Sequence, residues 1–331
     1  MPFPSRSSGP STSDRLPGSD RSARSGRPVR SGRSARVRNR AAYLFLTPAT
    51  VLFLAFLVAP ICYAVVLSTR ASTVTGGGIG VRVERFVGLR NYRDALSDPE
   101  LWQSMVRLLW YGLIVVPVML GCALLFALLL DARRVRAKRF SRIAIFLPYA
   151  VPGVVATLLW GFLYLPDISP LHDLFGLVGL AAPDPLGPEL VIGAVANIAI
   201  WGGTGFNMIV LYTSLRAVPS ELYDAARIDG CGEIGLATRI KIPLLVPALV
   251  MTGIFSLIAT LQVYSEPATL RPLTNTISST WVPLMKVYRD AFVNGDPYLA
   301  AATSVVLALG TLVVSLGLLR VLQDRAFGEE R

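Results

Sequence analysis

The chain has few of the residues from which catalytic and metal sites are built. Among its 331 residues are one histidine and three cysteines, and only 16% are charged, against roughly 25% in average soluble domains. The cysteines, at positions 62, 122 and 231, have no paired spacing, so neither a disulfide framework nor a metal site is expected. His172 stands alone among prolines and aspartates, which is typical of a surface loop. The sequence therefore predicts no enzymatic activity, no metal and no cofactor.

Charge is missing most completely from six long segments. Each contains no Asp, Glu, Lys or Arg and is close to the roughly 20 residues that cross a bilayer as a helix. Because backbone groups in lipid need partners within their own segment, all six are predicted to be transmembrane helices of an all-α, multi-pass membrane protein. The segments are Ala41–Thr69, Leu108–Leu130, Ile143–Leu165, Leu190–Leu215, Pro243–Ser265 and Ala300–Leu319.

Basic residues are unevenly divided between the two sides of this arrangement. With both termini in the cytoplasm, the inner segments hold 23 of the 32 Lys and Arg residues and a net charge of +13, whereas the outer segments carry −2. An excess of Lys and Arg in cytoplasmic loops is the pattern that sets membrane orientation. We therefore expect both termini, and the loop between the fourth and fifth segments, to face the cytoplasm.

The first 40 residues are rich in Arg, Ser, Gly and Pro and nearly empty of large apolar side chains. Such a segment cannot bury enough surface to fold, so residues 1–40 are predicted to be a disordered cytoplasmic tail, and residues 326–331 a second short tail. Contact of the ten arginines with anionic lipid stays open as an alternative. Nucleic-acid binding is not expected, since no folded basic surface with interleaved aromatic residues accompanies the charge.

A polar segment interrupts the apolar pattern between the fourth and fifth predicted helices. It reads Glu-Leu-Tyr-Asp-Ala-Ala-Arg-Ile-Asp-Gly over 221–230, and Ile-Lys-Ile-Pro follows over 240–243. Pro219 and Ser220 mark a helix start, with Ser220 as the expected cap, and Gly230 marks the helix end. A short polar helix between two membrane spans predicts a docking element for a partner outside the membrane.

The side chains of this short helix suggest how a partner would grip it. Ala225 and Ala226 are small enough to let another surface approach the backbone closely. Larger apolar side chains are expected to anchor the partner, namely Leu222, Tyr223 and Ile228.

The same segment closely resembles the EAA loop of permease subunits in binding-protein-dependent ABC importers. That pattern is Glu-Ala-Ala, three residues, Gly, nine residues, then Ile, any residue, Leu and Pro, and the spacing here is the same throughout. Asp224 stands in place of the Glu and Ile242 in place of the Leu. The resemblance implies a helix that couples the permease to its ATPase. The implied residues are Glu221, Leu222, Tyr223, Asp224, Ala225, Ala226, Arg227, Asp229, Gly230, Ile240 and Pro243.

Three further motifs are similar to the carbohydrate-uptake branch of that family, which includes the maltose and glycerol-phosphate permeases. They are Phe86–Tyr92 before the second span, Phe146–Tyr149 in the third and Phe206–Met208 in the fourth. The resemblance implies a type I ABC importer permease fold. Its six-helix domain would cover residues 41–325, with the cytoplasmic coupling loop at 216–243.

This resemblance also implies a function and partners. The chain would be the permease subunit that moves a sugar or related polyhydroxy solute across the cytoplasmic membrane of a prokaryote. Its partners would be a second homologous permease in a heterodimer, two ATPase subunits and an extracytoplasmic solute-binding protein. Separate ATPase subunits agree with the sequence, because no Gly is followed by Lys and the phosphate-binding loop Gly-x-x-x-x-Gly-Lys-Ser/Thr is therefore absent.

Polar and aromatic residues near the fourth and fifth segments are candidates for the substrate path, since hydroxyl groups need hydrogen-bond partners and sugar faces stack on aromatic rings. None is charged, which favours a neutral sugar over a phosphorylated substrate. Each has an alternative interpretation as an interfacial anchor or an interhelical hydrogen bond. The candidates are Asn197, Trp201, Asn207, Tyr212, Gln262 and Tyr264.

Two other classes of protein stay open at this point. Ion-coupled secondary transporters usually carry ionisable residues inside the membrane. The predicted spans have none, although backbone carbonyls also bind sodium. A membrane anchor without transport is the second alternative, and it would not need the polar loop at 216–243.

Overall fold

The computed structural model describes residues 32–74, 82–132, 135–179 and 181–326, and the chain divides into two compact units. The first unit ends at Val58 and contains the helix α1 (Gly32–Phe53) and the π-helical turn η1 (Leu54–Val58). Because α1 begins at Gly32, it extends into the segment expected to be disordered. Arg and Ala favour helix there. The remaining residues of both predicted tails, 1–31 and 327–331, lie outside the described residues.

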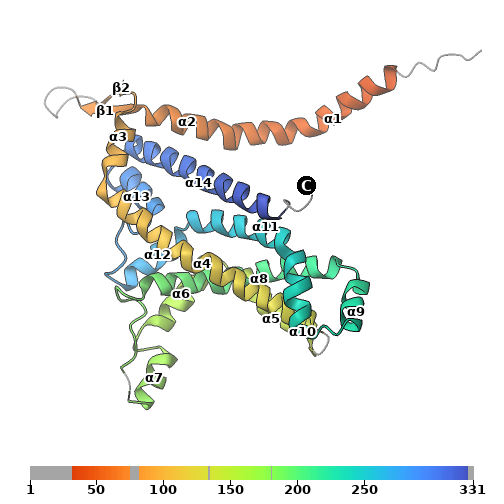
Figure 1. Ribbon diagram of the computed structural model, residues 1–331. Coiled ribbons are helices and arrows are strands. Elements are labelled where there is room, and N and C mark those ends of the chain that lie inside the picture. The colour runs from red at the N-terminus through yellow and green to blue at the C-terminus, as the bar shows by residue number, and fades with distance from the viewer. Residues whose placement is uncertain (1–31, 75–81, 133–134, 180, 327–331) are drawn as a thin grey trace, which may run out of the picture. The chain divides into compact units, whose positions relative to one another are not determined.

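Long helices dominate the chain (Figure 1). In the part of the chain that the structure describes, five helical segments are long and apolar enough to cross a membrane: Tyr43–Ser68, Pro99–Asp131, Val191–Ala217, Glu233–Leu261 and Pro297–Arg320. They coincide with five of the six predicted spans. In the second unit, Ala59–Arg331, the corresponding helices are α2 (Ala59–Ser68), α4 (Pro99–Asp131), α8 (Val191–Ala217), α11 (Ile242–Leu261) and α14 (Pro297–Ala326).

The third predicted span is not one continuous helix. Its pieces are α5 (Lys138–Phe146), the 3₁₀ turn η2 (Leu147–Ala150) and α6 (Gly153–Tyr164). They are bent by 96° at the break. Val151 is extended because it precedes Pro152, and a proline also lacks the N–H that would continue the helical bonding. The expectation of a single helix over Ile143–Leu165 is therefore wrong.

Short elements connect the long helices. They are β1 (Arg70–Val74), β2 (Arg82–Phe86), α3 (Arg90–Ser97), α7 (Pro170–Leu177), α12 (Ser265–Leu270), η4 (Arg271–Leu273), α13 (Pro283–Tyr288) and η5 (Arg289–Val293). Strands β1 and β2 pair antiparallel with Arg70 opposite Phe86, a small hairpin that the all-α prediction did not include. His172, expected in a loop, is exposed on α7.

The Phe86–Tyr92 motif joins the end of α2 to the start of α3. Gly88 has a φ of +61°, a conformation that glycine adopts without strain. The Asn91 side chain donates to the carbonyls of Ser68 and Arg70 at 2.8 and 2.7 Å. Tyr92 bonds the Ser68 hydroxyl at 2.6 Å. The motif therefore supplies partners for backbone groups left open where α2 ends.

Two clusters of buried apolar residues hold the membrane helices together. One joins α4, α6, α8 and α12 and includes Tyr111, Val195 and Leu270. The other joins α4, α8 and α11 through residues such as Ala127, Leu211 and Leu245. Helices α8 and α5 approach so closely that a methyl group at position 205 would overlap the backbone at position 145, which explains the glycine there.

Candidate functional site: a docking helix and a membrane cavity

The polar segment forms the helix α9 (Ser220–Ile228), at the end of α8 away from the β-hairpin (Figure 1). Gly230 has a φ of +84° and donates to the Arg227 carbonyl at 3.0 Å, while the N–H of Cys231 donates to the Ala226 carbonyl at 2.9 Å. These two bonds form a Schellman motif, which ends a helix at a left-handed residue. The prediction that Gly230 ends this helix is confirmed.

The start of α9 differs from the prediction. Pro219 occupies the N-cap position with an extended ψ of 135°, and no side chain caps the helix there. Ser220 is already the first helical residue, so the expectation that it caps the helix is wrong. Glu221 lies in the first turn, where its charge interacts favourably with the helix dipole.

Two residues expected to meet a partner instead face the chain itself. Ala226 is buried at 8% exposure, so it is not open to a docking surface. The Tyr223 hydroxyl donates to the Leu215 carbonyl at 3.3 Å, and the Lys241 ammonium lies 5.3 Å from the Tyr223 ring centre. Burial raises the pKa of Tyr223, and the nearby Asp131 raises it further. Tyr223 thus holds α9 against the end of α8 and against η3.

The surface open to a partner is made of other apolar residues. Ile228 is 86% exposed and Leu222 is 50% exposed. Ile234, in the following turn α10 (Glu233–Leu236), is 82% exposed. Large apolar side chains at such exposure on a short helix are typical of an interaction surface. Sequence reasoning missed Ile234, although it lies in the same loop as Ile228.

Ionic contacts hold this surface in place. Arg227 contacts Asp224 at 3.1 Å and Glu233 at 3.4 Å, joining α9 to α10. The Lys241 ammonium lies 2.6 Å from the Asp131 carboxylate, and both side chains are more than 90% buried. Lys241 ends the π-helical turn η3 (Ala237–Lys241), so this pair fixes the coupling loop to the end of α4.

The other predicted coupling residues lie on or near the same loop. Ala225 and Asp229 are exposed, with Asp229 at the C-cap of α9. Ile240 is partly buried in η3, and Pro243 lies in the first turn of α11. Pro243 directly follows the π-helical turn η3 within the continuous helical segment Glu233–Leu261, so its missing N–H falls where the α-helical bonding is already interrupted.

A cavity of about 570 Å³ lies between the membrane helices. Residues of α4, α6, α8 and α11 line it, together with the bend at Pro148–Val151 and the segment that follows α11. Three of the six residues predicted for a substrate path are in the lining, namely Asn207, Gln262 and Tyr264. The cavity is large enough for a small ligand.

The other three predicted path residues do not line this cavity. Asn197 donates to the hydroxyl of Tyr164 at 3.0 Å, which joins α8 to α6. Trp201 packs edge-on against Trp160, with ring centres 6.0 Å apart. Tyr212 packs on the second apolar cluster. The Asn197 contact matches the interhelical hydrogen bond that the sequence left open as an alternative, whereas Trp201 and Tyr212 make apolar packing contacts.

The lining residues also differ from their expected settings. Gln262 falls within the fifth predicted span, but α11 ends at Leu261 and the exposed Gln262 side chain follows at the C-cap. Asn207 is buried, donates to the Gly203 carbonyl at 3.0 Å and accepts from the Ser256 hydroxyl at 3.4 Å. It therefore both joins α8 to α11 and faces the cavity.

Sequence reasoning missed several polar lining residues: Tyr149, Ser256, Thr260 and Glu266. Ser256 and Thr260 are spaced four apart on α11, a spacing that places both on one helix face. That spacing was an available signal. Glu266 gave none, because it lies beyond the predicted span.

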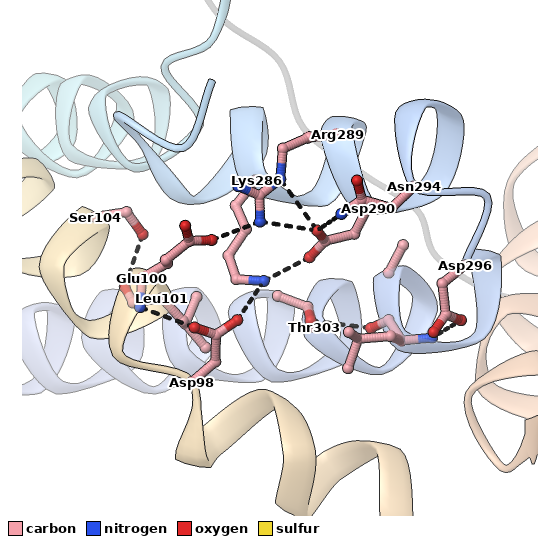
Figure 2. Close-up of polar contacts among 12 residues, drawn as sticks. Asp98, Glu100, Leu101, Ser104, Lys286, Arg289, Asp290, Asn294, Asp296 and Thr303 are labelled. Carbon is pink, nitrogen blue, oxygen red and sulfur yellow. Dashed lines mark hydrogen bonds and ion pairs between the residues drawn. The ribbon is translucent and has the colours of Figure 1, made fainter. Parts of the chain in front are cut away.

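A second ionic site, the Lys286 cluster, consists of Asp98, Glu100, Lys286, Arg289 and Asp290 (Figure 2). Lys286, 1% exposed, contacts Asp98 at 2.7 Å and also pairs with Asp290. Arg289 pairs with Glu100 and contacts Asp290 at 3.2 Å. Asn294 donates to Asp290 at 3.0 Å. The start of α4 is thereby tied to α13 and η5.

The charged states of this cluster follow from its contacts. Burial by itself lowers the pKa of Lys286, but hydrogen bonds to Asp290 and Asp98 outweigh it and raise the pKa above its usual value. For Asp98, burial raises the pKa, but the bonds from Lys286 and the Glu100 N–H lower it overall. Both groups are charged at neutral pH. The four-residue spacing of Lys286 and Asp290 was an unused signal for this site.

The apolar helices, the cavity between them and the exposed apolar surface of α9 are consistent with a class, the membrane-embedded subunit of a transporter. Residues 123–327 match the family described as the binding-protein-dependent transport system inner membrane component, and the chain belongs to this family. The match confirms the resemblance inferred from the polar loop. The chain is thus a multi-pass permease subunit of an ABC importer, rather than an ion-coupled carrier or an anchor.

Individual relatives cover most of the chain. It is 31% identical to the lactose transport system permease protein LacF of Rhizobium radiobacter, over 68% of this chain and 74% of the relative. It is 30% identical to the sn-glycerol-3-phosphate transport system permease protein UgpA of Agrobacterium fabrum, over 86% of this chain and 94% of the relative.

A solved structure confirms the fold. A bacterial alginate ABC transporter, in complex with an alginate pentasaccharide-bound periplasmic protein, contains a chain that matches with a TM-score of 0.76 and 20% identity. The match covers 89% of this chain and 97% of that one.

Proposed function

We propose that the chain is one of two homologous permeases in a heterodimeric importer of a neutral sugar or related polyol. Two ATPase subunits dock on the cytoplasmic side and an extracytoplasmic solute-binding protein delivers the substrate. The relatives named for lactose and sn-glycerol-3-phosphate transport support a small polyhydroxy substrate. The excess of basic residues beside α9 supports its cytoplasmic location, with both termini on the same side.

The exposed apolar surface of α9 and α10 is the observation that carries the coupling part of this proposal. Its members are Leu222, Ile228 and Ile234. The buried Lys241–Asp131 pair and the Tyr223 contacts fix this surface to the ends of α4 and α8. A rigidly held helix transmits a push from an ATPase to the spans, whereas a loosely held one would absorb it. The predicted coupling residues then divide into those that meet the ATPase and those that anchor the helix.

Substitution at equally exposed sites tests the coupling surface. Ile228→Glu places a charge where an ATPase pocket would close, so binding-protein-stimulated uptake and co-purification of the ATPase should both fall at least tenfold. Leu177→Glu is the matched control, since Leu177 is 85% exposed on α7 and Ile228 is 86% exposed. Equal membrane levels are checked by immunoblot. Unchanged uptake and ATPase retention in Ile228→Glu would rule out this surface as the docking element.

The cavity carries the substrate part of the proposal. Its lining offers hydroxyl and amide groups from Asn207, Ser256 and Thr260, and aromatic faces from Tyr149 and Tyr264. The one charged lining side chain, Glu266, is acidic, and no Lys, Arg or His lines the cavity in the described part of the chain. An acidic lining without cations disfavours a phosphate and suits a neutral polyol.

Valine substitutions of two buried threonines on α11 test the substrate path. Thr260 lines the cavity, and Thr252 does not; each bonds the carbonyl four residues earlier. Thr260→Val should raise the apparent KM for a neutral disaccharide about threefold to tenfold through the loss of one hydrogen bond, while Thr252→Val leaves it unchanged. Equal KM values in both variants would remove the cavity from the path. Preferred uptake of glycerol 3-phosphate would overturn the neutral substrate.

A further inference from the structure

A second, smaller cavity lies where the membrane helices end beside α9. Its volume is about 220 Å³. Charged residues from five elements line it: Asp131 at the end of α4, Lys138 at the start of α5, Arg216 near the end of α8, Arg227 on α9 and Lys241 in η3. We call these five residues the Lys241 cluster. Two candidate spans end beside this cavity, at Asp131 and Ala217, and the bent helix pair begins there at Lys138. The ends of membrane spans lie at the depth of lipid headgroups.

The charges in this cavity do not balance. Four cations face one acid, Asp131, which is already paired with Lys241. Arg227 is paired outside the cavity, with Asp224 and Glu233. Lys138 and Arg216 have no acidic partner among the described residues. Two cations converging on one cavity without a counter-charge are stabilised by a bound anion.

The neighbouring helix α5 indicates which anion would bind. Phe140 and Ile143 on α5 are 74% and 62% exposed, and they alternate with the basic residues Arg139 and Arg142. A helix with exposed apolar and basic side chains at the end of a span lies in the membrane interface. Basic pockets between membrane helices on the cytoplasmic side bind the headgroups of anionic lipids.

We propose that this cavity binds the phosphate headgroup of an anionic phospholipid, with Lys138 and Arg216 as its ligands and the acyl chains lying along α5. Tyr223 and Arg227 of α9 line the same cavity. Headgroup occupancy therefore contacts the helix that receives the ATPase in the function proposed above, and on that function the lipid composition of the inner leaflet becomes an input to the transporter.

Native mass spectrometry of the purified full-length chain tests this site without any need for transport. Wild-type protein, released from detergent in the presence of equal phosphatidylglycerol and phosphatidylcholine, should retain phosphatidylglycerol preferentially. The double variant Lys138→Gln/Arg216→Gln should lose roughly 25-fold in this preference, since each cation near the surface contributes about fivefold. The charge-keeping variant Lys138→Arg/Arg216→Lys should retain it, which excludes a simple folding defect.

A second double variant, at exposed basic residues outside the cavity, is the control. Arg136→Gln/Arg239→Gln removes two exposed cations that lie outside α5 and do not line the cavity, and this variant should keep the preference. Equal losses in both double variants, or none in either, would overturn the proposal. Displacement of phosphatidylglycerol by millimolar inorganic phosphate would show a site for free phosphate instead. Displacement by the ATPase subunits would show that a protein carboxylate occupies the cavity, and either result would overturn the lipid assignment.

Discussion

Two buried lysines lie near opposite ends of α4, and they differ in the supply of acidic partners. In the Lys286 cluster three carboxylates surround two cations, and every charge has at least one partner (Figure 2). In the Lys241 cluster a single buried pair is surrounded by cations that it does not neutralise.

The two sites are therefore built for different purposes. A network with every charge satisfied has one low-energy arrangement, and it holds α13 and η5 against α4. A site with surplus positive charge has capacity for another molecule, and it lies beside the helix proposed to receive the ATPase. A buried Lys–Asp pair is present at both sites. In the Lys286 cluster it belongs to a balanced network that joins helices, whereas in the Lys241 cluster it lies among cations that are not neutralised.

The largest effect is expected from Asp290→Leu. Asp290 is 2% exposed and accepts from Lys286, Arg289 and Asn294, so the substitution leaves buried donors without their acceptor. We expect a loss of about 3–5 kcal/mol in the free energy of unfolding. Thermal unfolding in detergent measures it, with Asp173→Leu on the exposed surface of α7 as the control. Equal unfolding temperatures for the two variants would show that the Lys286 cluster is not a clamp.

Lys241→Met should have a smaller effect on stability and a larger one on coupling. It leaves Asp131 unpaired beside a cavity that admits water, which costs about 2 kcal/mol. The loop bearing α9 also loses its anchor, so uptake should fall by more than the membrane level of the protein. Adding Asp131→Leu should restore stability, because an apolar pair replaces an ionic one, but should not restore uptake fully. Full uptake in the single variant would contradict the anchoring role.

Alanine substitutions at two glycines test the backbone geometry at the end of α9. Gly230→Ala places a side chain at a φ of +84° and should cost about 1 kcal/mol in stability, with a partial loss of uptake. Gly232→Ala is the control two residues later, because Gly232 has a φ of −72° and open space around it. Chemical denaturation of both variants measures the difference. Equal midpoints would mean that the Schellman motif does not stabilise α9.

The smallest effect concerns pH at the Lys286 cluster. Asp98 has a lowered pKa, so its contribution to the free energy of unfolding is present at neutral pH and is lost as the pH falls through that pKa. Lys286 has a raised pKa, so its contribution to the free energy of unfolding is lost only as the pH rises through that pKa. Asp98→Asn keeps the helix cap and removes the charge. The unfolding temperature of wild type should exceed that of Asp98→Asn by a constant amount between about pH 5 and 9, narrowing below about pH 4. A steep change near pH 7 would contradict the assigned charges.

Prediction from sequence succeeded where the signal lies in neighbouring residues. Five of the charge-free segments are candidate membrane spans in the structure, and Gly230 ends its helix as predicted. It was wrong in expecting one continuous helix at the third span, where two helices meet at a 96° bend and together are long and apolar enough for one broken span. It was also wrong in expecting Ala226 to be open to a partner, because this small side chain is buried against its own chain. The sequence does not show whether an alanine faces a partner or the interior of its own protein, so only the packing of the folded chain distinguishes the two cases.

The sequence by itself determined the membrane class, the number of apolar segments and the place of the polar helix α9, because hydropathy and helix-ending residues act over short stretches of chain. Tertiary structure alone decided which polar groups meet. Arg289 and Glu100 are separated by 189 positions, and Ser256 and Asn207 by 49. Partner choice at such separations depends on how helices cross and bend, and each crossing is set by packing along whole helix faces rather than by any one residue.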